Sequence, residues 1–306
     1  MQRALYLATL GSGRVSPNPM VGAVIAVGDR IIGEGYHRVY GGPHAEPNAV
    51  RSVKESDRPL LPEATMYVTL EPCSHYGKTP PCADLLIETG FRRVVIATRD
   101  PFPKVSGAGI EKLRQAGVEV SVGLLGAESR WLNRRFFTAH TLGRPYILLK
   151  WAQSRDGFIG LEGGLEGGRP VRISNAVSEV WMHRERSLYD AILVGTGTVI
   201  SDNPSLTCRL WPSREGRPLR ATFESPRLPA DCKLEREGCL KKRREENLED
   251  FLKRLYTEEG ITSLMVEGGR KTLQSFIDAG LWDEARVETS LTELGRGVKA
   301  PVFIPG

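Results

Sequence analysis

Long apolar runs and an even set of cysteines are both missing from this 306-residue sequence. No hydrophobic stretch approaches the roughly 20 residues of a membrane-spanning helix, and the N-terminal residues lack the apolar core of a signal peptide. Five cysteines cannot all pair, and two of them occupy ligand-like positions, which favours a reducing compartment. These shortages predict a cytoplasmic protein with no membrane partner, and with Cys208, Cys232 and Cys239 as free thiols.

A strong charge of one sign is also missing. The formal net charge of +5 suits an anionic small molecule as well as a nucleic acid, so it decides between neither. The length exceeds that of an ordinary single domain, and the hydrophobic fraction of 40% can fill two cores. Breaks at residues 141–145 predict two domains, residues 1–143 and residues 144–306.

What the sequence does contain is a set of metal-ligand residues around residues 44–82. His44, Cys73 and Cys82 supply the borderline and soft ligands that suit tetrahedral zinc with one position left open. Glu46 follows His44 by two residues, so the set resembles the H-x-E and P-C-x-x-C signature of zinc deaminases, although eight residues separate these cysteines. Each residue alone has an ordinary structural explanation. Together they predict a zinc-dependent hydrolytic deaminase of an amino-substituted heterocycle, with Glu46 moving the protons.

Apolar patterns place these ligands on an α/β framework. We expect helices near residues 1–10, 44–54, 82–88 and 110–116, and strands near 21–27, 30–36, 65–70, 93–98 and 118–122. His44 and Cys82 then begin helices and Cys73 follows a strand, so the three side chains can meet at one sheet edge. Backbone N–H groups and the dipole at a helix start favour a thiolate.

The second half contains two strands that end in glycine-rich turns, after a linking helix at 127–139 whose Trp131, Phe136 and Phe137 are interpreted as packing residues. Strands are expected at 146–151, 191–194 and 264–266, and helices at 272–279 and from a cap at Ser174 or Asn175 to about 188. The turns at 195–198 and 267–269 let backbone approach a phosphate or dinucleotide closely. The residues alone do not separate NAD from NADP.

Several longer motifs resemble one known family. S-P-N-P-M-V-G-A-V at 16–24, G-P-H-A-E at 42–46, and L-E-P-C-S-H-Y-G-K-T-P-P-C at 70–82 are similar to the deaminase half of the RibD family of bifunctional riboflavin biosynthesis proteins. D-P-F-P at 100–103 with Val105, Gly107 and Gly109 continues the match. The longer cysteine spacing is that family's own pattern. Pro47 stands where the family more often has valine, but proline is tolerated in a first helical turn, so zinc binding is expected to persist.

The second half resembles the reductase half of the same family. The matching stretches are K-W-A-Q-S-R-D-G at 150–157, D-A-I-L-V-G-T-G-T-V at 190–199, D-N-P-S-L-T-C-R at 202–209 and V-E-G-G at 266–269. The resemblance implies a cytidine-deaminase-like three-layer α/β/α domain followed by a dihydrofolate-reductase-like α/β domain. It also implies zinc-dependent deamination of 2,5-diamino-6-(5-phosphoribosylamino)pyrimidin-4(3H)-one, and then NADPH-dependent reduction of the ribosyl group of 5-amino-6-(5-phosphoribosylamino)uracil to ribityl.

The resemblance also implies a role for individual residues. Zn²⁺ would be held by His44, Cys73 and Cys82, with Glu46 as the catalytic residue. NADPH would be bound by Ala152, Thr198, Asp202, Ser225, Gly269, Arg270, Lys271 and Thr272. The phosphoribosyl pyrimidine substrates would contact Asn18, Arg186, Leu206, Arg209 and Glu267. The expected partners are this small molecule and further copies of the chain in a homo-oligomer, without nucleic acid.

Two alternatives remain open. The first is a deaminase with an inactive reductase-like domain. Pro170 and Arg172 replace the family's usual serine and tryptophan, and residues 232–247 are short and charged where the family has an additional strand. The other is a nucleic-acid editing deaminase, which would predict a broad basic and aromatic face. The basic run at 241–244 is followed by Glu245 and Glu246, so it is interpreted as a solvated helix start.

Overall fold

The first part of the chain is built on a sheet of mixed direction. The computed structural model describes residues 1–76, 80–102, 106–161, 165–166, 169–170, 173–213 and 218–302. It divides the chain into two units, Met1–Leu142 and Gly143–Gly306, whereas the sequence predicts the division one residue later. The sheet of the first unit has the strand order β2 (Arg30–Tyr36), β1 (Gly22–Val27), β3 (Thr65–Val68), β4 (Arg93–Ile96) and β5 (Glu119–Val122). β1 is antiparallel to β2 and β3, while β3, β4 and β5 are parallel.

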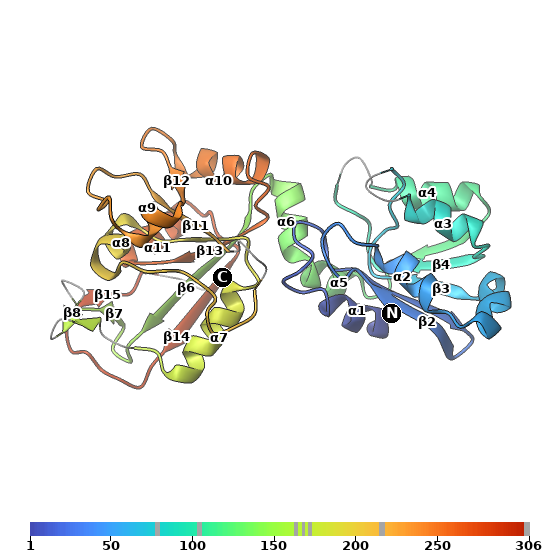
Figure 1. Ribbon diagram of the computed structural model, residues 1–306, viewed down its shortest axis with the longest axis horizontal. Helices are drawn as coiled ribbons and strands as arrows, with labels where there is room; N and C mark the ends of the chain where they lie inside the picture. Colours follow the sequence, from blue (N-terminus) through green and yellow to red (C-terminus); the bar gives the residue numbers. More distant parts are fainter. Residues whose placement is uncertain are drawn as a thin grey trace. The chain divides into compact units, whose positions relative to one another are not determined.

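Helices cover both faces of this sheet (Figure 1). One face carries α2 (Ala45–Ser52), α3 (Cys82–Glu88) and α4 (Ala108–Gln115), and the other carries α1 (Gln2–Thr9) and α5 (Gly126–Leu132). Side chains alternate along β1, so that Ala23 and Ile25 pack under α2 while Val24 packs with Leu7 of α1. A 3-10 helix, η1 (Glu55–Glu63), leads into β3. The predicted three-layer α/β/α class is confirmed for this unit.

The linking segment differs from the prediction of one helix at 127–139. It forms two helices, α5 and α6 (Arg134–Leu142), which are separated at Asn133. The Asn133 side chain donates to the Met20 carbonyl and accepts from the Met20 N–H, both at 2.8 Å, so a contact 113 residues away determines the break. The interpretation of Trp131 as a packing residue is also wrong, because this residue is 65% exposed and its ring lies under the Arg134 guanidinium.

In the described part of the second unit, the main sheet has six parallel strands. Their order is β12 (Leu240–Lys242), β11 (Leu219–Phe223), β10 (Ala191–Leu193), β13 (Ser263–Glu267), β6 (Tyr146–Gln153) and β14 (Glu284–Thr289). Two short antiparallel pairs lie outside this sheet, β7 (Phe158–Gly160) with β15 (Val298–Lys299), and β8 (Leu165–Glu166) with β9 (Arg169–Pro170). Because strands β10 and β13 are parallel neighbours, the turns that follow them lie at the same sheet edge.

Both faces of the second sheet are also covered (Figure 1). α10 (Leu248–Thr257) and α11 (Arg270–Asp278) bury Phe251 and Phe276 against one face. The other face packs against α7 (Ala176–Arg186), α8 (Thr196–Asp202) and α9 (Lys233–Glu237). Asn175 is the cap of α7, since its side chain accepts from the Ser178 N–H at 2.9 Å. Among the described residues, no helix has the length and apolar character needed to cross a bilayer.

The basic run at 241–244 does not begin a helix, so that interpretation is wrong. Leu240–Lys242 form the edge strand β12, which pairs with β11. Leu240 packs against the core while the lysines stay at the sheet edge, as is common in edge strands. α10 begins only after Asn247, whose side chain accepts from the Asp250 N–H. Residues 232–247 therefore contain the short helix α9 and one edge strand.

Candidate functional site

The three predicted zinc ligands come together at one edge of the first sheet. His44 is the N-cap of α2, Cys73 follows β3, and Cys82 is the first residue of α3. Their ligand atoms all lie within 4.8 Å of one another, and His44 Nδ1 is 3.3 Å from Cys82 Sγ and 3.7 Å from Cys73 Sγ. One imidazole and two sulfurs at these separations fit a tetrahedral zinc ion with a fourth position open to a reactant.

Backbone groups prepare this cluster for a cation. The Cys82 N–H at the start of α3 donates to Cys73 Sγ at 3.3 Å, and the Ala83 N–H donates to the Cys73 carbonyl at 3.1 Å. A hydrogen bond from the Cys82 thiol, together with those from His44 and the Cys82 N–H, lowers the pKa of Cys73 to about 4. The thiolate, which is the metal-binding form, is therefore favoured at neutral pH.

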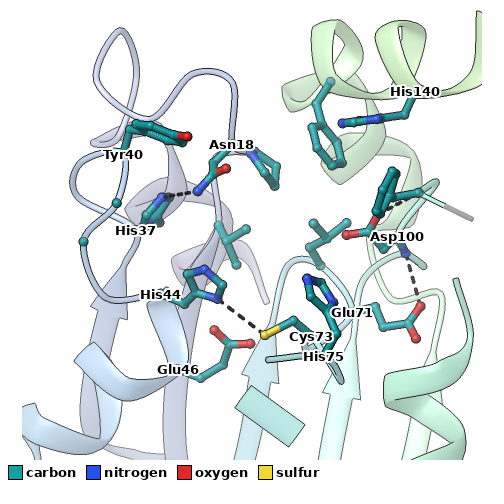
Figure 2. A pocket seen from close by; sticks show the side chains of 17 residues that line it. Asn18, His37, Tyr40, His44, Glu46, Glu71, Cys73, His75, Asp100 and His140 are labelled. Carbon is teal, nitrogen blue, oxygen red and sulfur yellow. Dashed lines mark hydrogen bonds between the residues drawn. The ribbon is translucent and has the colours of Figure 1, made fainter. Parts of the chain in front are cut away.

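Glu46 lies beside the ligands in the first turn of α2. Figure 2 shows its carboxylate, the His44 ring and the Cys73 sulfur facing one another. The side chain is only 3% exposed, and this burial raises the pKa of Glu46 to about 7, with His44 opposing the rise. A carboxyl group that titrates near neutral pH can both accept and return a proton in one reaction cycle.

A cavity of about 360 Å³ opens in front of this cluster. The predicted substrate residue Asn18 lies on its wall and contacts the buried His37 ring. Because the Pro43 carbonyl can only accept, His37 Nδ1 donates to it at 3.0 Å, and the neutral ring's Nε2 accepts from Asn18 Nδ2 at 3.1 Å. Asn18 therefore keeps its Oδ1 as an acceptor for a ligand in the cavity.

Several lining residues were missed by the sequence prediction. They are His37, Tyr40, Asp100, Phe102, Phe136 and His140. The rings of Phe102 and Phe136 pack edge to face on His140, with centroids 5.3 and 4.4 Å away, so Phe136 packs at the cavity wall. Burial raises the pKa of Asp100 to about 6. The D-P-F-P motif at 100–103 was the available signal for Asp100 and Phe102, but the sequence analysis assigned no role to these side chains.

The second unit has a cavity of about 560 Å³ at the edge where β10 and β13 end. Seven predicted residues line it: Ala152, Thr198, Asp202, Gly269, Arg186, Leu206 and Glu267. Arg209 lines an adjoining cavity of about 430 Å³ together with Arg186, Asp202 and Leu206. Ser225, Arg270, Lys271 and Thr272 are not among the described residues that line either cavity.

A hydrogen bond joins the first turn of α8 to the glycine-rich turn that follows β13. Thr198 Oγ1 accepts from the Gly269 N–H at 3.2 Å. Behind these turns Thr272 is buried, and its Oγ1 would lie 2.1 Å from a Cβ atom at position 195. Gly195 is therefore required for close packing of the turn against α11, and Thr272 supports the turn instead of lining the cavity. Close backbone approach of this kind suits a phosphate-bearing cofactor.

An ion pair between two largely buried side chains lines the second cavity. Arg186 of α7 donates to Glu267 of β13 through Nε at 2.8 Å and Nη2 at 2.7 Å, and each side chain is 13% exposed. Burial acts to raise the pKa of Glu267, but the Arg186 charge and hydrogen bonds, with help from Lys150, hold this pKa below its ordinary value. Burial also lowers the pKa of Lys150, which Glu267 opposes.

Lys150 was missed by the sequence prediction as a site residue, although it lines this cavity. The signal that could have found it is a single lysine inside the apolar run 146–151. Some expectations lie outside the described residues, namely Gly77, Lys78, Thr79, Pro103, Val105 and Arg172. The structure does not describe the side chain of Pro170 either.

Comparisons with known proteins agree with this division into two sites. Residues 145–301 match the RibD C-terminal domain, and residues 1–98 match the cytidine and deoxycytidylate deaminase zinc-binding region. Riboflavin biosynthesis protein RibD of Aquifex aeolicus is 41% identical, over 97% of this chain and 88% of that protein. RibD of Escherichia coli is 35% identical, over 100% of this chain and 90% of that protein.

Solved structures resemble the whole chain. A diaminohydroxyphosphoribosylaminopyrimidine deaminase/5-amino-6-(5-phosphoribosylamino)uracil reductase from Thermotoga maritima is 40% identical, with a TM-score of 0.86 over 98% of this chain and 88% of that one. Acinetobacter baumannii RibD is 33% identical, with a TM-score of 0.88 and the same coverage. The predicted fold class therefore extends to both halves.

Proposed function

This chain belongs to the RibD family of riboflavin biosynthesis proteins, and from that membership we propose how its two units divide the two reactions of the family. The family is one of bifunctional enzymes, hydrolase and oxidoreductase, that use zinc and NADPH. We assign deamination of 2,5-diamino-6-(5-phosphoribosylamino)pyrimidin-4(3H)-one to residues 1–143. Reduction of the ribosyl group of 5-amino-6-(5-phosphoribosylamino)uracil to ribityl is assigned to residues 144–306.

The observation that carries the deaminase assignment is the convergence of His44, Cys73 and Cys82 beside Glu46. Zinc held by these three ligands supplies a Lewis acid that activates water near neutral pH. Glu46 takes a proton from the attacking water and delivers protons to the ring nitrogen and to the departing ammonia, so that a C–N bond is exchanged for a C–O bond. The Asn18 amide, oriented by His37, accepts a hydrogen bond from the pyrimidine.

The reductase assignment is supported by the second cavity. Thr198 and Gly269 join the two turns against which NADPH would lie, and NADPH supplies the reducing equivalent when bound. Arg209 suits the substrate phosphate, because guanidinium binds phosphate in two-pronged fashion, whereas the corresponding edge of Arg186 is already bound to Glu267 and places that carboxylate at the cavity. Lys150, whose pKa is lowered by burial, gives the proton that completes the reduction. These groups favour an active reductase over an inactive one.

The remaining assignments concern partners and location. We assign phosphoribosyl pyrimidines as the substrates of both sites, without a nucleic-acid partner, and a homo-oligomer as the assembly. The cytoplasm is the proposed compartment, since the cysteines, including the two proposed ligands, are all unpaired thiols.

The test measures the two activities separately in one preparation. The purified chain receives the diamino-pyrimidinone phosphate with and without NADPH, and ammonia and NADPH absorbance are followed. We expect ammonia in both samples and NADPH oxidation in the second. Glu46→Gln should keep zinc and lose ammonia release by about 10²-fold or more, yet still oxidise NADPH with the deaminated intermediate. No ammonia from the zinc-loaded wild type refutes the deaminase assignment, and ammonia without NADPH oxidation refutes the reductase assignment.

A further inference from the structure

Glu71 is a buried carboxylate to which neither proposed reaction assigns a role. It lies two residues before the ligand Cys73 and is 4% exposed. Figure 2 shows its carboxylate directed toward the backbone at Asp100. The backbone N–H of Glu71 donates to the Thr98 carbonyl at 3.0 Å, so the residue is held against the chain that leaves β4.

Four backbone N–H groups donate to this one carboxylate. Oε2 accepts from Asp100 at 3.2 Å and Gly107 at 3.0 Å. Oε1 accepts from Gly109 at 3.0 Å and Ile110 at 3.3 Å. The last three donors belong to the N-cap and first turn of α4, where a negative charge is stabilised by unpaired N–H groups and by the helix dipole.

These contacts tie together two segments that line the first cavity. Asp100 and Phe102 belong to one segment, and Cys73 belongs to the other. The approach is close, because a Cβ atom at Gly109 would lie 2.0 Å from the Pro72 carbonyl oxygen, one residue from the ligand Cys73. The spacing between the wall at 100–102 and the metal ligands therefore depends on the bridge through Glu71 and Gly109.

We propose that Glu71 is a positioning residue for the deaminase. It holds the wall formed by residues 100–102 at a fixed distance from the zinc ligands, so that the bound pyrimidine is aligned with Glu46. The inference rests on the proposed deaminase function of this site. It requires a full carboxylate. A glutamine at 71 keeps the size of the side chain, but its NH₂ group would face one of the two N–H pairs, which leaves those donors without an acceptor and pushes them away.

The test compares Glu71→Gln with Glu111→Gln, the same change at an exposed residue of the first turn of α4. Zinc content, ammonia-release kinetics and amide hydrogen exchange are measured on the full chain, with NADPH oxidation as the folding control. For Glu71→Gln we expect wild-type zinc, faster exchange at Asp100, Phe102 and residues 106–110, and kcat/KM lower by about 10-fold to 100-fold, chiefly through KM. Glu111→Gln should match the wild type in all three.

Two results overturn the inference. One is unchanged exchange and KM in Glu71→Gln. The other is loss of zinc in parallel with activity, which would mean that Glu71 acts through the ligands instead of the wall. Should Glu71→Gln fail to fold, Glu71→Asp keeps the charge with a shorter reach, and it must still raise KM at full zinc content. If the wild type releases no ammonia, the proposed function fails, whereas the exchange comparison still tests the bridge.

Discussion

Replacing Arg186 by methionine would leave the Glu267 carboxylate buried without its main partner. The two hydrogen bonds of 2.8 and 2.7 Å join side chains that are each 13% exposed, so solvent screens them little. Two charges about 4 Å apart attract by about 4 kcal/mol at an effective dielectric constant of about 20. Desolvation offsets much of this attraction in the intact pair, but removal of one partner exposes the full penalty, about 3 to 5 kcal/mol.

We therefore expect Arg186→Met and Glu267→Gln each to lower the free energy of unfolding of the second unit by about 3 kcal/mol. The double variant should lose less stability than the sum of the two single losses, and the difference is a coupling free energy of about 2 kcal/mol. Urea unfolding followed by tryptophan fluorescence measures these values, since Trp151 lies in the core of this unit. NADPH identifies the relevant transition by raising its midpoint.

The pH dependence gives a second check on the same pair. In the wild type the pKa of Glu267 is lowered, so the stability from its ionised form is present above its ordinary pKa and is lost as the pH falls through the folded-state value. In Arg186→Met the arginine charge no longer opposes the effect of burial, so the pKa of Glu267 rises. Protonation of Glu267 then removes the buried charge. The deficit should be smaller at about pH 5 than at about pH 8. Additive single costs, or a deficit that grows in acid, would refute this reasoning.

Three further perturbations separate the sites. Removal of zinc by a chelator should abolish ammonia release and leave NADPH oxidation with the deaminated intermediate intact; parallel loss of both would contradict independent sites. Gly195→Ala should raise the KM for NADPH about tenfold, because the new Cβ would meet Thr272 Oγ1 at 2.1 Å. Adding Thr272→Ala to the same chain should reverse part of this rise in KM. Lys150→Met should slow NADPH oxidation by about 10²-fold without changing ammonia release. The control Lys253→Met, at an exposed residue, should change neither activity. An unaffected rate of NADPH oxidation in Lys150→Met would show that Lys150 does not transfer the proton.

Local patterns predicted much of the first site. His44 and Cys82 do begin helices, and Cys73 does follow a strand, because start signals and strand patterns act over a few residues. The same is true of the cap at Asn175. The turn expected at 195–198 is shorter than predicted, because Gly195 is an N-cap and α8 begins at Thr196. The three ligand side chains meet because β3 and the two helix starts share one sheet edge, which the alternation of strands and helices predicted.

Predictions were wrong where distant contacts compete with local preference. The break at Asn133 depends on the Met20 backbone, and the strand at Leu240–Lys242 depends on an open sheet edge beside β11. Both stretches have compositions compatible with a continuous helix. Tertiary hydrogen bonds and sheet pairing overrode that preference, which is normal for marginal local propensities.

Which chemistry this protein carries can be read from its residue types, because an imidazole, two thiolates and a carboxylate keep their reactivity wherever the chain places them. The sequence also indicates where the turns that approach a cofactor occur, since glycine permits that backbone locally. The folded chain, in contrast, was needed to see that Lys150, Arg186 and Glu267 share one cavity and that Glu71 joins the wall at Asp100 to the metal ligands. These groups are brought together by strand order and helix packing, and such contacts between residues far apart in sequence leave no periodic signal in the chain.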